Sequence, residues 1–284
     1  MNAIEDVLTK KGIDFQHKGS DYLVKCFNPE HEDSSPSMRI DMNSGAYHCF
    51  SCGYKGNLLR QFSISHVTNH KITELKDRLG ALRLPPPVGY CEDAVFNVES
   101  FRGLKKETID RFEMYRSEEY FPDRVVIPLY DLQGRIVANL GRYERSDVSP
   151  KYMMKPEIPA PWMPIPEKCN FVTRVLVLVE GPMDVINLYD KGGITNAVAV
   201  MGAKTVNKEN IYDKLLPYMV AGVQKVIIAF DGDSAGRNAA DYVNQLINYN
   251  TPLVSEVYSL PDGKDPGSMS SREIERLKNQ FTTH

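Results

Sequence analysis

The spacing of hydrophobic positions changes character near residue 174. From there on, short apolar runs alternate with stretches in which apolar residues recur every three or four positions. The runs predict strands at 175–179, 197–201, 225–230 and 254–259. The periodic stretches predict helices at about 183–191, 205–219 and 235–248. This alternation of strands and helices, with short connections, predicts a parallel sheet covered by helices.

The first 65 residues have a different pattern, built from shorter pieces. An amphipathic opening precedes three strand-like segments, at 22–25, 37–41 and 46–49. Two stretches with helical spacing of apolar residues follow, at 58–64 and 66–83. The pattern predicts a compact, β-rich module at the N-terminus.

Proline interrupts the middle of the chain. Pro85–Pro87 cannot lie inside a helix or a central strand, which predicts a stiff, extended linker. After it we expect a short helix at 105–112 and a hairpin with strands at 124–130 and 135–140. The prolines of residues 156–167 predict an irregular surface loop.

The predicted fold is of the α/β class, with a small β-rich domain in front of it. The expected boundaries are 1–83 for the N-terminal domain, 84–94 for the linker, 95–172 for a mixed α+β subdomain and 173–284 for the parallel α/β sheet.

The composition is that of an ordinary globular protein, with 42% hydrophobic and 25% charged residues. A net charge of −3 excludes a binder whose whole surface is basic, so any contact with nucleic acid must use local patches. No apolar stretch approaches the roughly 20 residues that span a bilayer, and the N-terminus lacks the pattern of a secretory signal. We therefore expect no membrane contact and a cytoplasmic location, where paired cysteines hold metal more often than they form disulfides.

Four residues near the N-terminus have the spacing of a zinc site. They are Cys26, His31, Cys49 and Cys52. A C-x2-C pair on a tight turn is the usual half of such a site, and Gly53 allows that turn. Ligands of this kind without a carboxylate predict one structural Zn²⁺, without which so small a module is not expected to fold. His48 is the competing histidine, but it adjoins Cys49 and would point away from a site that Cys49 faces, which favours His31.

Carboxylates follow the predicted strands of the C-terminal region. They are Glu180, Asp184, Asp231, Asp233 and Asp265. In open α/β sheets ligands bind beyond the carboxyl ends of the strands, and carboxylates gathered there repel one another unless a cation lies between them. The pattern predicts a Mg²⁺ or Mn²⁺ site for phosphate chemistry. Each acid alone has a simpler interpretation, as a residue that caps the next helix or turn. For Asp184 the simpler interpretation is an acid in the first turn of a helix, where the helix dipole favours negative charge.

Taken together, these segments resemble the bacterial and phage primases of the DnaG type. Residues 36–57 are similar to that family's CHC2 zinc ribbon, and residues 180–185 and 231–237 resemble its Toprim motifs. Residues 260–266 resemble its later acidic motif, although Gly267 stands where a further acid is common. Segments that resemble the polymerase core of the family are 101–104, 134–142 and 150–152.

The resemblance implies a DNA primase, which is a DNA-directed RNA polymerase that makes short RNA primers from ribonucleoside triphosphates on single-stranded DNA. The catalytic, ion-holding residues would be Glu180, Asp231 and Asp233. Asp265 and Asp184 would add a second ion or outer ligands, and the sequence is compatible with Glu180 as a ligand or as the base.

The expected contacts to nucleotide and DNA come from Arg142, Lys151, Tyr152, Lys155 and Arg237. For Arg142 and Lys151 the simpler interpretation is an exposed, salt-bridged cation. The zinc domain would bind the template, and the linker would raise its local concentration at the catalytic core.

The resemblance also implies a replicative helicase that acts in trans and, for a compact phage-type enzyme, a location in the host cytoplasm. Two other functions stay open. One is a Toprim nuclease or topoisomerase-like enzyme that uses the same acids for strand cleavage. The other is a zinc-dependent DNA-binding protein without catalysis.

Overall fold

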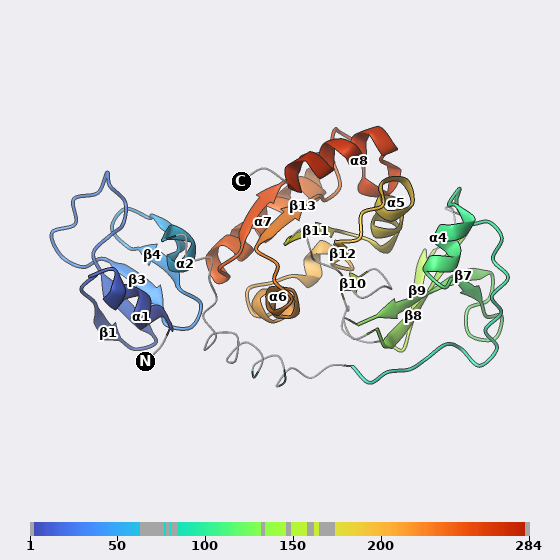
Figure 1. Cartoon of the computed structure of the whole chain (residues 1–284), viewed down its shortest axis with the longest axis horizontal. Helices are drawn as coiled ribbons and strands as arrows, with labels where there is room; N and C mark the ends of the chain where they lie inside the picture. The colour runs from blue at the N-terminus through green and yellow to red at the C-terminus, as the bar shows by residue number, and fades with distance from the viewer. Residues whose placement is uncertain are drawn as a thin grey trace. The chain divides into compact units, whose positions relative to one another are not determined.

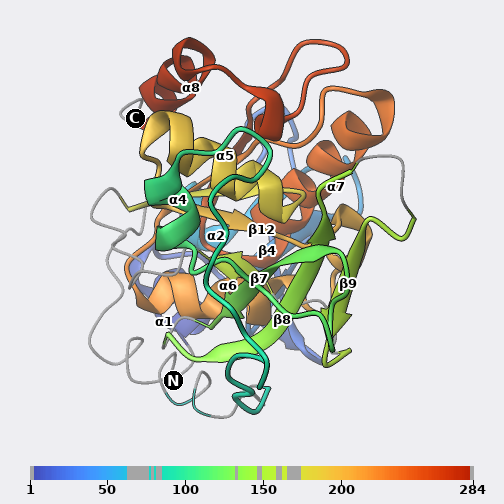
Figure 2. The ribbon, with the colours of Figure 1, turned by 90° about the vertical axis from the view of Figure 1, so that its right-hand side faces the viewer.

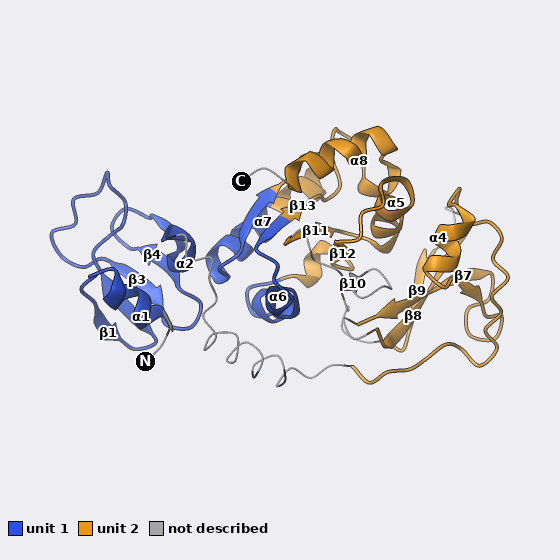
Figure 3. Cartoon of the chain, viewed as in Figure 1, with its two compact units in different colours: residues 1–82, 207–226, 241–256 blue, residues 83–206, 227–240, 257–284 orange. Residues whose placement is uncertain are grey.

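The structure is a computed structural model. It describes residues 3–62, 77, 80, 85–131, 134–145, 149–157, 162–164 and 174–281. The chain forms two compact units, each assembled from segments that are distant in the sequence (Figure 3). The first contains residues 1–82, 207–226 and 241–256, and the second contains residues 83–206, 227–240 and 257–284.

The N-terminal segment of the first unit folds into a five-stranded antiparallel sheet with the order β1-β2-β3-β4-β5 (Figure 1). The strands are β1 (Gln16–Lys18), β2 (Asp21–Val24), β3 (Met38–Asp41), β4 (Ala46–Cys49) and β5 (Lys55–Asn57). The three strands that the hydrophobic pattern predicts are β2, β3 and β4. The pattern does not predict the two edge strands, β1 and β5. β1 is exposed throughout, so its sequence shows no alternation of buried and exposed positions.

Two short helices, α1 (Ala3–Lys10) and α2 (Leu58–Gln61), contribute to the core of this sheet. Leu8 and Leu58 are fully buried. Burial of such a side chain contributes about 1.5–3 kcal/mol, but a core with so few members is small for an independent domain. The fold of this module therefore depends on an additional source of stability.

The second unit contains an antiparallel sheet with the order β6-β7-β8-β9. Its strands are β6 (Tyr115–Arg116), β7 (Arg124–Tyr130), β8 (Ile136–Tyr143) and β9 (Tyr152–Lys155), and the helix α4 (Lys106–Arg111) precedes them. The predicted hairpin is confirmed as β7 and β8, with β8 ending at Tyr143 rather than at Leu140. The strand β9 pairs with β8 and brings Tyr152 opposite Arg142.

The C-terminal sheet has the order β10-β12-β11-β13-β14. Its strands are β10 (Met163–Pro164), β11 (Val175–Val179), β12 (Ala197–Ala199), β13 (Lys225–Ile228) and β14 (Val254–Val257). β11 and β12 are parallel, as the alternation of strands and helices predicts. β10 is an antiparallel edge strand, so the prediction of an irregular loop for 156–167 is wrong at this point. An edge strand tolerates proline because one side of it needs no ladder hydrogen bonds.

Helices α5 (Pro182–Gly192), α6 (Ile211–Val220), α7 (Ser234–Asn250) and α8 (Ser271–Lys278) accompany this sheet, together with the short 3-10 helices η1 (Ala203–Thr205), η2 (Pro266–Ser268) and η3 (Asn279–Phe281). The helix predicted at 205–219 begins later, at Ile211. Asn207 and Asn210 explain the delay, because each side chain accepts a hydrogen bond from the other's backbone N–H and closes a turn there. α4 and α8 both contact α5 (Figure 2).

Within the predicted linker 84–94, two residues are bound to β8. Val88 N–H donates to Ile136 O at 2.8 Å, and Asn139 Nδ2 donates to Gly89 O at 2.9 Å. The predicted domain boundaries stay predictions. Most of the predicted helix 66–83, Cys169 and parts of the proline-rich segment lie outside the described residues. Among the residues that are described, no helix has the length and apolar character needed to cross a membrane.

Candidate metal centre and acidic pocket

The cysteine and histidine cluster joins two loops of the N-terminal sheet. Cys26 and His31 lie on the loop after β2, whereas Cys49 ends β4 and Cys52 lies in the turn after it. All four ligand atoms lie within 4.8 Å of one another. The sulfurs of Cys26 and Cys52 are 3.6 Å apart, and Cys49 Sγ lies 3.7 Å from His31 Nδ1. A tetrahedron with bonds of about 2.3 Å to sulfur and 2.0 Å to nitrogen has corners about 3.5–3.8 Å apart, so the four residues fit one Zn²⁺.

The choice between the two histidines follows from the strand geometry. Cys49 is fully buried, and successive residues of a strand point to opposite faces. His48 accordingly lies against the ring of Phe50, with 4.8 Å between the ring centroids, and is not in the cluster. Gly53 has φ +76°, as the tight turn after Cys52 requires.

Asp33, which the spacing of cysteines does not reveal, organises the ligand loop. Its Oδ2 accepts hydrogen bonds from Cys26 N–H at 2.8 Å and from Ser37 Oγ at 2.8 Å. Ser37 Oγ in turn lies 3.2 Å from Cys49 Sγ. Burial alone would raise the pKa of Cys49, but polar contacts at its sulfur, among them hydrogen bonds from the backbone N–H groups of Cys52 and Ser51, outweigh it and lower this pKa to about 6. The thiolate is the form of cysteine that binds zinc, and a pKa near neutral makes it available.

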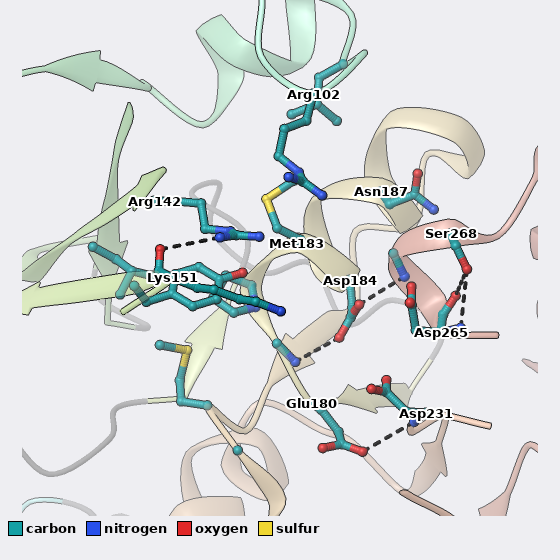
Figure 4. A pocket seen from close by; sticks show the side chains of 18 of the residues that line it. Arg102, Arg142, Lys151, Glu180, Met183, Asp184, Asn187, Asp231, Asp265 and Ser268 are labelled. Carbon is teal, nitrogen blue, oxygen red and sulfur yellow. Dashed lines mark hydrogen bonds between the residues drawn. The ribbon is translucent and has the colours of Figure 1, made fainter. Parts of the chain in front are cut away.

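A second site is a pocket of about 710 Å³ in the second unit (Figure 4). That volume lies within the range of small-molecule sites. Carboxylates from three segments line it, namely Glu180, Asp184, Asp231 and Asp265. Basic side chains also line it, namely Arg102, Arg142, Lys151 and Lys191. The pocket thus offers both anionic and cationic groups to one ligand.

The acids come together because strand ends and one returning segment meet. Glu180 directly follows β11, and its Oε1 accepts a hydrogen bond of 3.3 Å from Asp231 N–H. Gly232 N–H donates to Lys264 O at 2.7 Å, which ties the segment that carries Asp265 to the end of β13. A Cβ atom at position 232 would lie 2.1 Å from Pro261 O. Only glycine permits this approach, and so the glycine in Asp-Gly-Asp is what brings Asp265 beside Asp231.

The Gly232→Ala variant should therefore be destabilised by about 2 kcal/mol, because a methyl group at this position must displace backbone. It should also separate Asp265 from Asp231 and weaken binding of divalent ions. Thermal unfolding and titration with Mn²⁺ measure the two effects. Gly80→Ala is the matched control, since a Cβ there meets nothing within 4 Å. Unchanged stability and ion affinity in Gly232→Ala would contradict this account of the site.

The pKa values reflect the crowding of negative charge. Burial first, and then the charges of Glu180 and Asp265, raise the pKa of Asp231 to about 6. Burial also raises the pKa of Glu180, and the charge of Asp233 adds to the effect. Acids that raise one another's pKa in a pocket favour a cation between them, and hard carboxylate oxygens suit Mg²⁺ or Mn²⁺. The donor set therefore fits a divalent ion.

Asp184 has a second role besides lining the pocket. Its Oδ2 accepts from Gly181 N–H at 2.8 Å, and its Oδ1 accepts from Gly267 N–H at 2.9 Å. It is buried, and burial followed by the charges of Asp231 and Asp265 raises its pKa to about 7. Both of its oxygens thus hold backbone of the site.

Three residues singled out from the sequence are not among those that line the pocket. Asp233 is exposed, and its Oδ1 accepts from Gly236 N–H at 2.7 Å at the start of α7. Arg237 is ion-paired with Asp262 at 2.7 Å, and Lys155 lies 5.7 Å from the ring centroid of Tyr120.

The basic wall of the pocket contains an ordered arginine. Arg142 on β8 is buried, and its guanidinium lies 4.7 Å from the ring centroid of Tyr152. Its Nη1 donates to Lys151 O at 3.4 Å. Arg102 joins this wall with φ +50°, a backbone conformation that non-glycine residues adopt rarely and that is found at functional sites. The periodicity of the sequence contains no signal for Arg102 or for Asn187, which also lines the pocket.

Two known families match parts of this chain. Residues 1–80 match the CHC2 zinc finger family, and residues 174–257 match the Toprim domain family. A DNA primase of Pseudomonas putida is 34% identical in an alignment that covers 95% of this chain and 51% of the relative. The chain spans between 51% and 66% of the length of the curated relatives that match it first.

Solved structures show the same likeness. The zinc-binding and RNA polymerase domains of the Aquifex aeolicus primase superpose with a TM-score of 0.54 at 21% identity, over 99% of this chain and 83% of that one, which is a likeness of fold. A DnaG primase catalytic domain bound to single-stranded DNA has a TM-score of 0.51 at 26% identity, over 63% of this chain and 68% of that one.

Proposed function

We propose that this chain is a DnaG-type DNA primase that makes short RNA primers on single-stranded DNA. The matches to the CHC2 zinc finger and Toprim families and to curated DNA primases support the proposal. One observation carries the proposal: carboxylates from three segments and a set of basic side chains line the same pocket. Such a pocket can hold divalent ions against the phosphates of a nucleoside triphosphate. The DNA-bound catalytic domain of the related primase supports single-stranded DNA as the template.

The ion site would be formed by Glu180, Asp231 and Asp265, which line the pocket. The charge of Asp233 acts on Glu180 and Asp231 from outside the pocket lining. Mg²⁺ or Mn²⁺ bound there would neutralise the charge that builds on the phosphoryl oxygens during nucleotidyl transfer. Glu180 is the residue with two possible tasks. Its raised pKa and its place at the end of β11 suit either an ion ligand or the base that takes the proton of the attacking hydroxyl.

The basic wall would bind the triphosphate or the template phosphates. Arg142 is the best placed member, because Tyr152 fixes the plane of its guanidinium. Lys151, directly before β9, and Arg102, in the loop before α4, would add positive charge. A guanidinium held in one plane can make two parallel hydrogen bonds to a phosphate.

The Arg142→Lys variant should raise the KM for nucleotide at least about tenfold, since loss of one charge-assisted hydrogen bond costs about 1.5–3 kcal/mol. Arg135→Lys is the matched control, because Arg135 is ion-paired with Asp131 at 2.6 Å and does not line the pocket. Steady-state kinetics with varied nucleotide measures the effect. Equal KM values in the two variants would exclude Arg142 from the nucleotide site.

The zinc ribbon would read the template through one face of its sheet. Phe50 is 67% exposed, and the guanidinium of Arg39 lies 5.6 Å from the centroid of its ring. His48 lies against the same ring. Exposed aromatic rings with cations stack bases and hold phosphates of single-stranded nucleic acid. We further propose a cytoplasmic location and a replicative helicase that acts in trans.

The experiment that tests the proposal is incorporation of labelled ribonucleotides on single-stranded DNA oligonucleotides without an added primer. A primase yields short labelled RNA that depends on the template. Cleavage of the oligonucleotide without incorporation would instead indicate a Toprim nuclease. Binding without either reaction would indicate a zinc-dependent DNA-binding protein, and both of these results reject the proposal.

A further inference from the structure

One buried amide in the wall of the pocket has no part in the chemistry described so far. Asn187 lies one turn after Asp184 on α5, is 4% exposed and lines the pocket (Figure 4). Its Nδ2 donates two hydrogen bonds, to Pro266 O at 2.8 Å and to Met269 O at 3.0 Å. Both acceptors belong to the segment that begins with Asp265. A buried side chain that donates both of its N–H hydrogens to the backbone of one loop fixes the position of that loop.

The loop in question has little regular structure of its own. Between Leu260 and α8 it contains only the single 3-10 turn η2. Asp265 begins that turn, and Ser268 Oγ closes it by accepting from Asp265 N–H at 3.2 Å and donating to Asp265 O at 2.9 Å. These contacts shape the turn but do not attach it to the rest of the site. The segment is tied to Gly232 through Lys264 O just before the turn. The turn itself is held by α5, through Asn187 and through Asp184 Oδ1, which accepts from Gly267 N–H.

The absence of a side chain at position 267 tightens this attachment. A Cβ atom there would lie 2.8 Å from Asp184 Oδ1 and 3.1 Å from Asp265 Oδ1. The backbone of Gly267 therefore fills the space between the two carboxylates, and the turn fits against α5 in one position. The place of Asp265 therefore depends on the register of the loop on that helix, in addition to the hydrogen bond from Gly232 N–H to Lys264 O.

We propose that Asn187 is a positioning residue that holds Asp265 in the divalent ion site. The inference rests on the proposed ion site and adds a residue that acts through Asp265 without touching the ion. Polar groups that orient a metal ligand from behind typically change metal affinity by 10–100-fold when they are removed.

The test is a double-mutant cycle on Mn²⁺ affinity, measured by electron paramagnetic resonance on the zinc-loaded full chain. Asn187→Leu has nearly the same size and no donor, and it should weaken Mn²⁺ binding about tenfold. Asp265→Asn should also weaken binding. The double variant should bind no more weakly than Asp265→Asn alone, because Asn187 acts only through Asp265.

The matched control is Asn196→Leu. Asn196 is also 4% exposed, and its Nδ2 donates to Val175 O at 2.8 Å, at the opposite end of β11 from Glu180. Its replacement should lower the temperature of unfolding without a change in Mn²⁺ affinity. If Asn187→Leu does not fold, as circular dichroism would reveal, Asn187→Ser takes its place in the cycle, and a tenfold loss is again expected.

The possible outcomes separate the role of Asn187 from the existence of the ion site. Wild-type Mn²⁺ affinity in the folded Asn187 variant overturns the inference and leaves the ion site standing. Additive losses in the double variant, or an equal loss in Asn196→Leu, also overturn it, because the effect would then be a general loss of stability. A wild-type chain that binds no Mn²⁺ overturns the ion site and the inference together.

Discussion

Replacement of Glu180 by glutamine is expected to reduce the proposed primer synthesis about a thousandfold, with the fold intact. Glu180 lies at the end of β11, inside the pocket, and hydrogen bonds to the backbone of Asp231. Glutamine has the same shape and accepts the same hydrogen bond, but it lacks the charge that a divalent ion or a transferred proton requires. Ion-assisted charge stabilisation is worth several kcal/mol, and about 4 kcal/mol corresponds to about a thousandfold in rate.

The measurement is the initial rate of ribonucleotide incorporation at saturating template, with unfolding temperature as the check on the fold. Glu119→Gln is the control, because Glu119 is exposed and does not line the pocket. Its rate should equal that of the unchanged chain. A Glu180→Gln variant with more than about a tenth of the normal rate would remove Glu180 from the catalytic site.

Loss of zinc is expected to have the largest effect on structure. In Cys49→Ala the bound zinc should fall from one equivalent to nearly none, and residues 3–62 should unfold. The side chain of Cys49 is fully buried, and the hydrophobic core that contains it is small. Zinc binding supplies about 10–16 kcal/mol to modules of this kind, which exceeds what such a core contributes.

Metal analysis measures the zinc, and limited proteolysis measures the order of the N-terminal segment. Cys91→Ala is the control, because Cys91 is free and lies outside the cluster, beside the hydroxyl of Tyr115. Protease should cleave the N-terminal segment of Cys49→Ala rapidly and leave that of Cys91→Ala intact. A zinc-free Cys49→Ala chain that resists protease would reject a structural role for the ion.

The two sites differ in how far the sequence predicts them. The zinc ligands are recognisable because C-x2-C places two thiolates on one turn, a local relation that needs no knowledge of the fold. Asp33, which orients two segments of that cluster through Cys26 and Ser37, has no such local signal. In the acidic pocket, Glu180 and Asp231 are predictable from the apolar strands before them.

The elements show the same division. Strands with buried apolar side chains, such as β7 and β11, appear at the predicted positions. The exposed strand β1 and the two-residue strand β10 do not, since their hydrogen bonds depend on partners elsewhere in the chain. The start of α6 differs from prediction because two asparagines close a turn that periodicity does not register.

By itself the sequence determined the class of the fold, the zinc ligands and the carboxylates at the strand ends, because these depend on side chains that are near one another along the chain. The tertiary structure decided which of those carboxylates share a pocket, and it added Arg102 and Asn187 to that pocket. The physical reason lies in Gly232, where the missing side chain lets a segment about thirty residues away fold against the end of β13. Close approach of backbones is a property of the folded chain, and it is what joins Asp265 to Asp231.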